Sequence, residues 1–153
     1  MQPYPHHYSA CAAGHPRGAV NLDSPSLPTL ASTSPPEFDG PCGHWSPETL
    51  LTAAVADCLV LTFRALARAA QFEWLALECR VEGTLDRSHG AACFTEFRTH
   101  ARLRVPAGAS TQEAQRLLER AERSCLVTNS LRALRAIDCE VVAAEPPSGS
   151  PPA

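Results

Sequence analysis

The sequence predicts an α+β fold, and three of its features carry that prediction. A long stretch in the first half is apolar on nearly every helical face, two later stretches alternate apolar with polar residues, and a capped helix follows them. Strands with one apolar face need a cover, and a helix that is apolar all round needs neighbours on every side. Because one small sheet cannot easily enclose such a helix, we expect a homodimer. Two of these helices would lie together, with antiparallel strands of both chains closing over them.

The long helix is expected from Ser46 to about Ala70. Ser46 is a favoured N-cap, and Pro47 suits the first helical position because the N–H that proline lacks would have no partner there. From Leu50 to Phe63, aliphatic and aromatic residues dominate. We interpret the segment as a buried helix that is too short and too polar in its middle to span a bilayer, which takes about 20 apolar residues.

Two short extended runs come before this helix, at residues 8–12 and 19–22. The turn between them contains glycine and proline and holds Arg17, which is typical of a hairpin. Residues 23–45 then hold five prolines and two glycines. Because proline has no N–H to donate to a helix or a sheet, we expect an extended surface loop without regular structure there.

After the long helix, residues 74–86 and 93–105 each alternate apolar with charged side chains. Alternation with a period of two predicts two strands with one solvated face, antiparallel to each other and joined through residues 87–90. Ser110 and Glu113 have the spacing of a capping box, which predicts that a second helix begins there. We expect this second helix to continue through about Arg123. A short helix capped by Thr128 or Asn129 should follow and end at Arg135. The chain is then expected to form a strand from Ile137 to Ala143 and a disordered tail over residues 146–153.

Length and composition favour one domain, residues 1–145, in a cytoplasmic protein. The chain has 153 residues, a net charge of −3 and no lysine, and its arginines are spread along the sequence. This distribution does not suggest nucleic acid or a membrane surface as a partner. The N-terminus lacks the charged and apolar regions of a secretory signal, and seven cysteines without tight spacing are typical of cytosolic thiols.

Three of the cysteines are expected to be inert. Cys79, Cys93 and Cys139 fall at strand positions with apolar neighbours, where a free cysteine behaves as a small packed hydrophobe. Cys11 and Cys42 receive no assigned role. The sequence contains no Cys-x-x-Cys pair, and its histidines lack helical ligand spacing, so we expect no zinc or other metal site.

Cys58 and Cys125 differ from the other cysteines because both belong to helical segments. A thiol is nucleophilic as the thiolate, which needs nearby positive charge to offset the cost of burial. Cys58 lies too far from the start of its helix for the dipole to help much, so an arginine from elsewhere would have to supply that charge. The residues alone also leave Cys58 open as one more core thiol.

The sequence around these two cysteines resembles a known family. Residues 46–51 read Ser-Pro-Glu-Thr-Leu-Leu and lead to Ala-Asp-Cys58 on the same helix, and residues 123–131 read Arg-Ser-Cys-Leu-Val-Thr-Asn-Ser-Leu. This arrangement resembles the osmotically inducible protein C and organic hydroperoxide resistance (OsmC/Ohr) family of thiol-dependent peroxidases. The order of elements is similar over nearly the whole chain.

The resemblance implies an intertwined homodimer with its active sites at the subunit interface. Cys58 would be the peroxidatic thiol and Cys125 the resolving thiol, while Arg17 would stabilise the thiolate and Glu48 would hold Arg17. It also implies an organic hydroperoxide as substrate, no cofactor, and an external dithiol reductant, often a lipoylated protein. The sequence departs from many members at Leu126, where they have proline.

The resulting hypothesis is that Cys58 becomes a sulfenic acid and then forms a disulfide with Cys125. Phe38, Trp45 and Phe63 are candidates for the apolar walls that would favour an organic peroxide. Asp57, beside Cys58, would oppose reactivity if it faced the thiol. Two alternatives stay open: a non-catalytic member that binds a small apolar ligand or senses redox state, and acyl transfer by Cys58 with His44 or His15.

Overall fold

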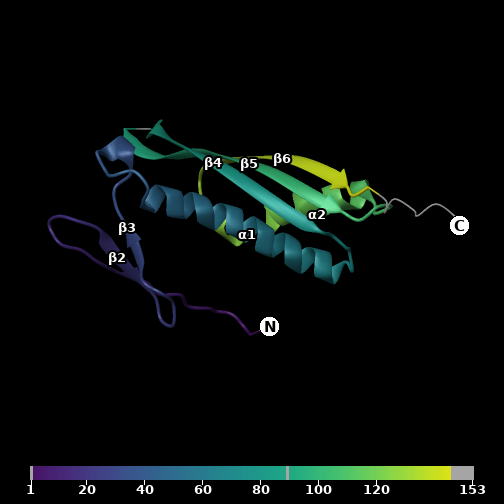
Figure 1. Cartoon of the computed structure of the whole chain (residues 1–153), viewed down its shortest axis with the longest axis horizontal. Helices are drawn as coiled ribbons and strands as arrows, with labels where there is room; N and C mark the ends of the chain where they lie inside the picture. The colour runs from purple at the N-terminus through teal and green to yellow at the C-terminus, as the bar shows by residue number, and fades with distance from the viewer. Residues whose placement is uncertain (1, 89, 146–153) are drawn as a thin grey trace, which may run out of the picture. The chain divides into compact units, whose positions relative to one another are not determined.

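The computed structural model describes residues 2–88 and 90–145 of the chain (Figure 1). These residues form two compact units, divided between Leu51 and Thr52, and each unit is described by itself. The first unit holds β1 (Cys11–Ala13), β2 (Val20–Asp23), β3 (Leu30–Ser32), a 3-10 turn η1 (Pro36–Phe38) and the beginning of α1. The second holds the rest of α1 (Pro47–Ala69) and then β4 (Ala76–Ser88), β5 (Ala91–Val105), α2 (Thr111–Ser124), α3 (Leu126–Asn129) and β6 (Leu134–Ala143).

The predicted N-terminal hairpin is present as β1 and β2, which pair antiparallel. The expectation that residues 23–45 lack regular structure is wrong, because β3 adds to β2 as a third antiparallel strand and η1 follows it. None of Leu30, Ala31 and Ser32 is a proline, although prolines lie on both sides of them. Each therefore has an N–H that can hydrogen-bond to a neighbouring strand. The strand is accordingly short, with three residues between Pro28 and Pro35.

The helix α1 begins and ends within a residue of its predicted limits. Ser46 caps it, since its side-chain oxygen accepts a hydrogen bond from the N–H of Thr49 at 3.2 Å and its carbonyl accepts one from Leu50 at 2.9 Å. The buried residues repeat every four positions and form one stripe: Val55, Leu59, Phe63 and Ala67.

The expectation that α1 is buried on all sides is not met within a single chain. Only 22% of its most apolar 18-residue stretch is buried, because one sheet and one helix cover a single stripe of its surface. The statement that it is too short and too polar to span a bilayer is also wrong, since α1 is long and apolar enough by length and composition alone. The core helix of a soluble protein can be equally long and apolar.

The second sheet has the order β4-β5-β6. The antiparallel β4–β5 hairpin was predicted; of its connecting residues, His89 lies outside the described part of the chain. The β5–β6 pair is parallel, so the expectation of purely antiparallel strands is wrong. Parallel neighbours need a crossover connection, and α2 with α3 provides it.

The end of the crossover also differs from the prediction. The short helix α3 is capped by Cys125 rather than by Thr128 or Asn129, and it ends at Asn129 rather than at Arg135. Arg135 instead lies in β6 and pairs with Phe97 of β5. Ladder hydrogen bonds to β5 outweigh the local helical preference of these residues. The predicted disordered tail, residues 146–153, lies outside the described residues.

A β-bulge in β5 changes which side chains face the core. Thr84 of β4 pairs with Glu96 and Leu85 pairs with Phe94, so Thr95 is an extra residue. One extra residue moves every earlier side chain of the strand to the other face. Phe94 therefore stacks on Phe97 with ring centroids 4.9 Å apart. Cys93 is exposed, and its predicted role as a packed core thiol is wrong.

The core of the second unit lies between the sheet and two helices. Residues of α1, β5 and α2 form one buried cluster, so both helices cover the same face of the sheet (Figure 1). The predicted N-cap of α2 is confirmed, because the Ser110 side chain accepts a hydrogen bond from the N–H of Glu113 at 3.2 Å. The arrangement places the middle of α1 beside the C-terminal end of α2, where the two candidate cysteines lie.

Candidate functional site

The structure brings Cys58 and Cys125 together. Cys58 lies in the middle of α1 and is partly buried, and Cys125 follows α2 and is 1% exposed. The Cys125 thiol donates a hydrogen bond to the Cys58 sulfur, and both residues are free thiols. Two cysteines that are 67 positions apart in the sequence therefore share one site within the second unit.

The surroundings of Cys58 stabilise its thiolate. Burial raises the pKa of the Cys58 thiol, but hydrogen bonds from the Cys125 side chain, the Val127 backbone, the Thr62 side chain and the Leu126 backbone together lower it below its ordinary value. The Cys58 Sγ lies 3.9 Å from the Thr62 Oγ1. Hydrogen bonds to the charged form favour ionisation in the same way as a neighbouring cation does. Within the described residues, the four groups that lower the Cys58 pKa are all uncharged hydrogen-bond donors.

Cys125 has the opposite tendency. Burial raises the pKa of the Cys125 thiol, its hydrogen bond to Cys58 raises it further, and hydrogen bonds from Thr128 only partly oppose this. Cys125 therefore keeps its proton at a pH where Cys58 has already lost its own. Of the two thiols in contact, Cys58 is therefore the one that ionises first.

The backbone after Cys125 explains how two main-chain donors reach Cys58. Cys125 has φ −66° and ψ 116°, which is extended, and it separates the end of α2 from the first turn of α3. The first N–H groups of a helix have no partner within the helix. Those of Leu126 and Val127 donate to the Cys58 sulfur.

Sequence reasoning missed Leu126 and Val127 as functional residues. Leu126 was noted only as a departure from the proline of many family members. The informative signal was that leucine keeps the backbone N–H that proline lacks.

Two other thiols on the same sheet face are not activated. Cys79 and Cys139 flank Ala101 in the strand register and pack against the core. The pKa of each thiol is raised to about 11, mainly by burial. At Cys79 the negative charges of the Cys125 and Cys139 thiolates raise it further. At Cys139 the charges of Glu119 and two other carboxylates do so. The prediction that Cys79 and Cys139 are packed thiols is confirmed.

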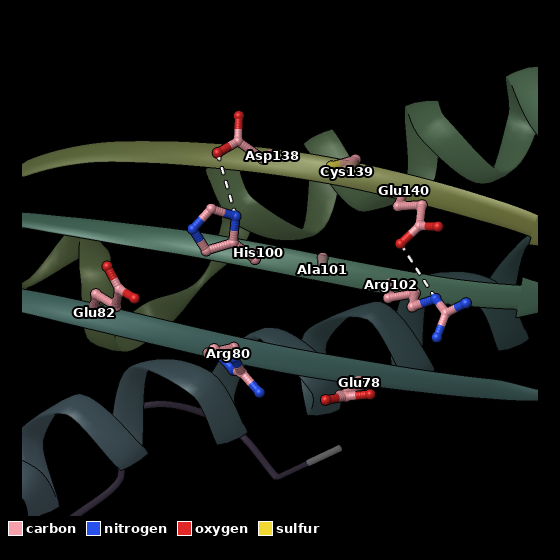
Figure 2. A pocket seen from close by; sticks show the side chains of 9 residues that line it. All are labelled: Glu78, Arg80, Glu82, His100, Ala101, Arg102, Asp138, Cys139 and Glu140. Atoms are coloured by element: carbon pink, nitrogen blue, oxygen red, sulfur yellow. Dashed lines mark ion pairs between the residues drawn. The ribbon is translucent and has the colours of Figure 1, made fainter.

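The opposite face of the sheet carries an open groove of about 540 Å³ (Figure 2). Two ion pairs lie along it: the His100 Nδ1 lies 3.4 Å from the Asp138 Oδ2, and the Arg102 Nε lies 3.2 Å from the Glu140 Oε2. The cysteine pair packs on the other face, so this groove is not its entrance. Within residues 2–88 and 90–145, no group of three or more His, Cys, Asp or Glu side chains could hold a metal ion.

Comparison with known families agrees with this site. The family described as OsmC-like protein matches residues 40–140, a span that includes both cysteines. The chain belongs to this family. An uncharacterised protein of Bacillus subtilis (strain 168), YmaD, is 25% identical over 132 residues, which cover 83% of this chain and 87% of the relative. The family resemblance found in the sequence is therefore confirmed.

Solved structures of OsmC-like proteins share the fold. One from Vibrio cholerae, of unknown function, has a TM-score of 0.80 at 16% identity and covers 88% of this chain and 99% of that one. An organic hydroperoxide resistance protein OsmC from Legionella pneumophila has a TM-score of 0.71 at 23% identity and covers 92% and 99% of the two chains. The α+β, OsmC-like fold prediction is confirmed.

Arg17 and Glu48 belong to the first unit, whereas both cysteines belong to the second. Arg17 is exposed and precedes Gly18, which has φ 93° in the turn between β1 and β2. Glu48 lies in the first turn of α1, as predicted, and is partly buried. The roles that the resemblance gives these two residues at Cys58 stay predictions.

The remaining residues singled out in the sequence have simpler surroundings. Asp57 is exposed and is not among the groups that shift the pKa of Cys58. Phe63 is fully buried and packs edge-to-face on Trp74, with ring centroids 5.4 Å apart, so it belongs to the core. Phe38 and Trp45 are exposed in the first unit. His15 and His44 are exposed there too, and the His44 Nδ1 lies 3.0 Å from the Cys42 carbonyl oxygen.

Proposed function

We propose that this OsmC-like protein is a thiol-dependent peroxidase that reduces organic hydroperoxides. The observation that carries the proposal is the contact between Cys58, whose thiol pKa is lowered, and Cys125, whose thiol pKa is raised. A nucleophile next to a protonated partner is what a two-cysteine peroxidase needs. Family membership and the fold shared with the Legionella hydroperoxide resistance protein support a role in peroxide metabolism.

In the first step, the Cys58 thiolate attacks the distal oxygen of the hydroperoxide. The O–O bond breaks, the sulfur is oxidised to a sulfenic acid, and the alkoxide leaves as an alcohol after taking up one proton. The backbone N–H groups of Leu126 and Val127 hold the sulfur in place before the attack. Arg17, held by Glu48, is proposed to stabilise the charge on the departing oxygen.

In the second step, the Cys125 sulfur attacks the sulfenic acid of Cys58. A disulfide forms, and the hydroxyl leaves as water with the Cys125 proton. The two side chains already share a hydrogen bond, so a small local movement suffices to reach the S–S bond length of about 2.05 Å. An external dithiol, a lipoylated protein for example, then restores both thiols by disulfide exchange.

The proposed functional form is a homodimer. In the single chain, most of the apolar surface of α1 is unburied, including Leu61, which is 48% exposed. A second copy of the chain would remove this surface from water, which favours association by about 25 cal/mol per Å² of apolar area. The intertwined arrangement of the family would also allow an arginine of either chain to reach Cys58.

The test uses purified, reduced protein with dihydrolipoamide and cumene hydroperoxide, and follows the loss of peroxide. We expect Cys58→Ser to abolish turnover and Cys125→Ser to stop it after about one equivalent. Cys79→Ser, which alters a packed thiol of the same core, should keep most of the activity. Mass spectrometry after one equivalent of peroxide should find a Cys58–Cys125 disulfide.

Three results would contradict the proposal in different ways. Peroxide loss that survives Cys58→Ser would refute the mechanism. A Cys58–Cys125 disulfide that forms without repeated turnover would favour a redox sensor, and cleavage of an ester substrate without peroxide loss would favour acyl transfer.

A further inference from the structure

Polar side chains from α2, α3 and β6 meet around the turn that carries Cys125. The Arg135 Nη1 donates a hydrogen bond to the Asn129 Oδ1 at 2.7 Å. The same nitrogen lies 3.4 Å from the Thr128 Oγ1, and the Arg135 Nε lies 3.5 Å from the Glu122 Oε1. One guanidinium on β6 therefore contacts side chains that lie on both sides of Cys125 in the sequence.

The two side chains that accept from Arg135 also donate to the backbone of this turn. The Thr128 hydroxyl donates to the carbonyl oxygen of Cys125 at 3.2 Å. The Asn129 amide nitrogen donates to the carbonyl oxygen of Arg123 at 3.2 Å. Each of these polar groups thus accepts on one side and donates on the other, which orients it. The network runs from Arg135 to the main chain on both sides of the Cys125 sulfur.

The contact between Arg135 and Glu122 is partly buried. The Glu122 side chain is 19% exposed and that of Arg135 is 35% exposed. Both residues line one small hollow together with Cys125 and Thr128. Removing the arginine would leave a partly buried carboxylate without its cation and would remove the donor to Asn129, so the turn would lose two of its constraints.

We propose that Arg135 is a positioning residue of the Cys58–Cys125 site, which holds residues 125–127 so that their donors point at the Cys58 sulfur. The inference deepens the proposed peroxidase function and rests on it where turnover is concerned. Arg135 acts through the turn, since it is not among the groups that shift the pKa of Cys58 directly. Lysine would replace it poorly, because a single ammonium cannot make the three contacts of the planar guanidinium.

The test compares Arg135→Gln with the wild type in the full-length, reduced protein. The rate at which iodoacetamide alkylates Cys58 is measured by mass spectrometry from pH 5 to 9, together with the thermal midpoint. We expect the Arg135→Gln profile to shift to higher pH, and alkylation at pH 6 to slow roughly threefold to fivefold for each unit of that shift. Arg135→Lys should restore only part of the rate.

Arg102→Gln is the matched control, because it breaks an arginine–carboxylate pair on the opposite face of the same sheet. Its alkylation profile should stay at the wild-type position. If Arg135→Gln does not fold, Asn129→Ala removes the strongest contact of the network while keeping Glu122 and Arg135, and it should shift the profile in the same direction. A lower thermal midpoint with an unchanged Cys58 profile in the folded variant would overturn the proposal.

Alkylation of Cys58 needs no peroxide, so the two proposals can fail separately. A protein without peroxidase activity whose Cys58 profile still shifts in Arg135→Gln would support the positioning role and contradict the peroxidase function. An active peroxidase whose Cys58 alkylation profile stays unchanged in the Arg135 and Asn129 variants would support the peroxidase function and contradict the positioning role.

Discussion

Cys58 and Cys125 form one group of neighbouring thiols in this protein, and Cys79 and Cys139 form another on the adjoining sheet. Burial raises the thiol pKa in both groups. At Cys58, hydrogen-bond donors outweigh burial and the pKa falls, whereas at Cys79 and Cys139 nearby negative groups add to burial and the pKa rises to about 11. Removal from water therefore does not decide which thiol has a lowered pKa.

The difference follows first from the Cys125 thiol, which donates to the Cys58 sulfur, and then from the backbone around each sulfur. N–H groups of a strand lie in the plane of the sheet, so they cannot reach a sulfur that stands on its face. The first N–H groups of a helix point out along its axis and lack internal partners. Cys58 faces the first turn of α3, and Cys79 and Cys139 stand on the sheet. Secondary structure thus adds to the Cys125 hydrogen bond in separating the thiol of lowered pKa from those of raised pKa.

The largest expected effect is the difference in alkylation between the two groups. At pH 7, a thiol with a pKa of about 11 is ionised in roughly one molecule in ten thousand. We expect iodoacetamide to modify Cys58 more than about a hundredfold faster than Cys79 or Cys139, because the thiolate is the reacting species. Time-resolved mass spectrometry measures this, and unfolding in urea should bring the three rates together. Equal rates in the folded protein would contradict the comparison.

A smaller effect is expected from Leu126→Pro, which removes one backbone donor to Cys58. Proline fits the first position of α3, and the extended backbone of Cys125 is compatible with a following proline. We expect the Cys58 pKa to rise by less than about one unit, because Leu126 contributes least of the four donors to the Cys58 sulfur. The pH dependence of alkylation measures it. Leu126→Ala keeps the N–H and should leave the profile unchanged.

A third effect concerns stability at alkaline pH. The folded-state pKa values of Cys79 and Cys139, about 11, lie above the ordinary value of 9.0. The folded state therefore holds more protons than the unfolded state between these values, and its free energy of unfolding falls as pH rises from about 9 to about 11. After allowance for partial exposure, we expect a loss on the order of 1 kcal/mol per thiol.

Thermal melts at pH 8 to 11 measure this loss. Cys139→Ala should weaken the pH dependence, while Cys11→Ala, which alters an exposed thiol, should leave it intact. A wild-type midpoint that stays constant over this range would argue against burial as the main cause of the raised pKa values.

A small effect is also expected from Thr62→Val. The Thr62 hydroxyl lies 3.9 Å from the Cys58 sulfur, which is long for a hydrogen bond. We expect the alkylation rate of Cys58 at pH 6 to fall by less than about twofold, because stronger donors remain. Thr62→Ser keeps the hydroxyl and serves as the control. A fall larger than that of Leu126→Pro would make the Thr62 hydroxyl a stronger donor than the Leu126 N–H.

Short-range patterns specified the elements that need no distant partner. Ser46 and Pro47 set the start of α1, Ser110 set the start of α2, and period-two alternation identified the β4–β5 hairpin. Each of these signals acts through residues that are neighbours along the chain or across one turn. Cys58 and Cys125 were found from the same kind of signal, a short stretch of sequence that resembles a family.

Long-range pairing specified the features that the sequence reading missed or placed wrongly. Residue Thr95 is an extra residue only relative to β4, and residues 134–136 become a strand only beside β5. The donors of Leu126 and Val127 matter because α1 brings Cys58 to the turn after α2. A hydrogen bond to that sulfur depends on the direction of two N–H vectors, and packing between elements far apart in the chain sets that direction.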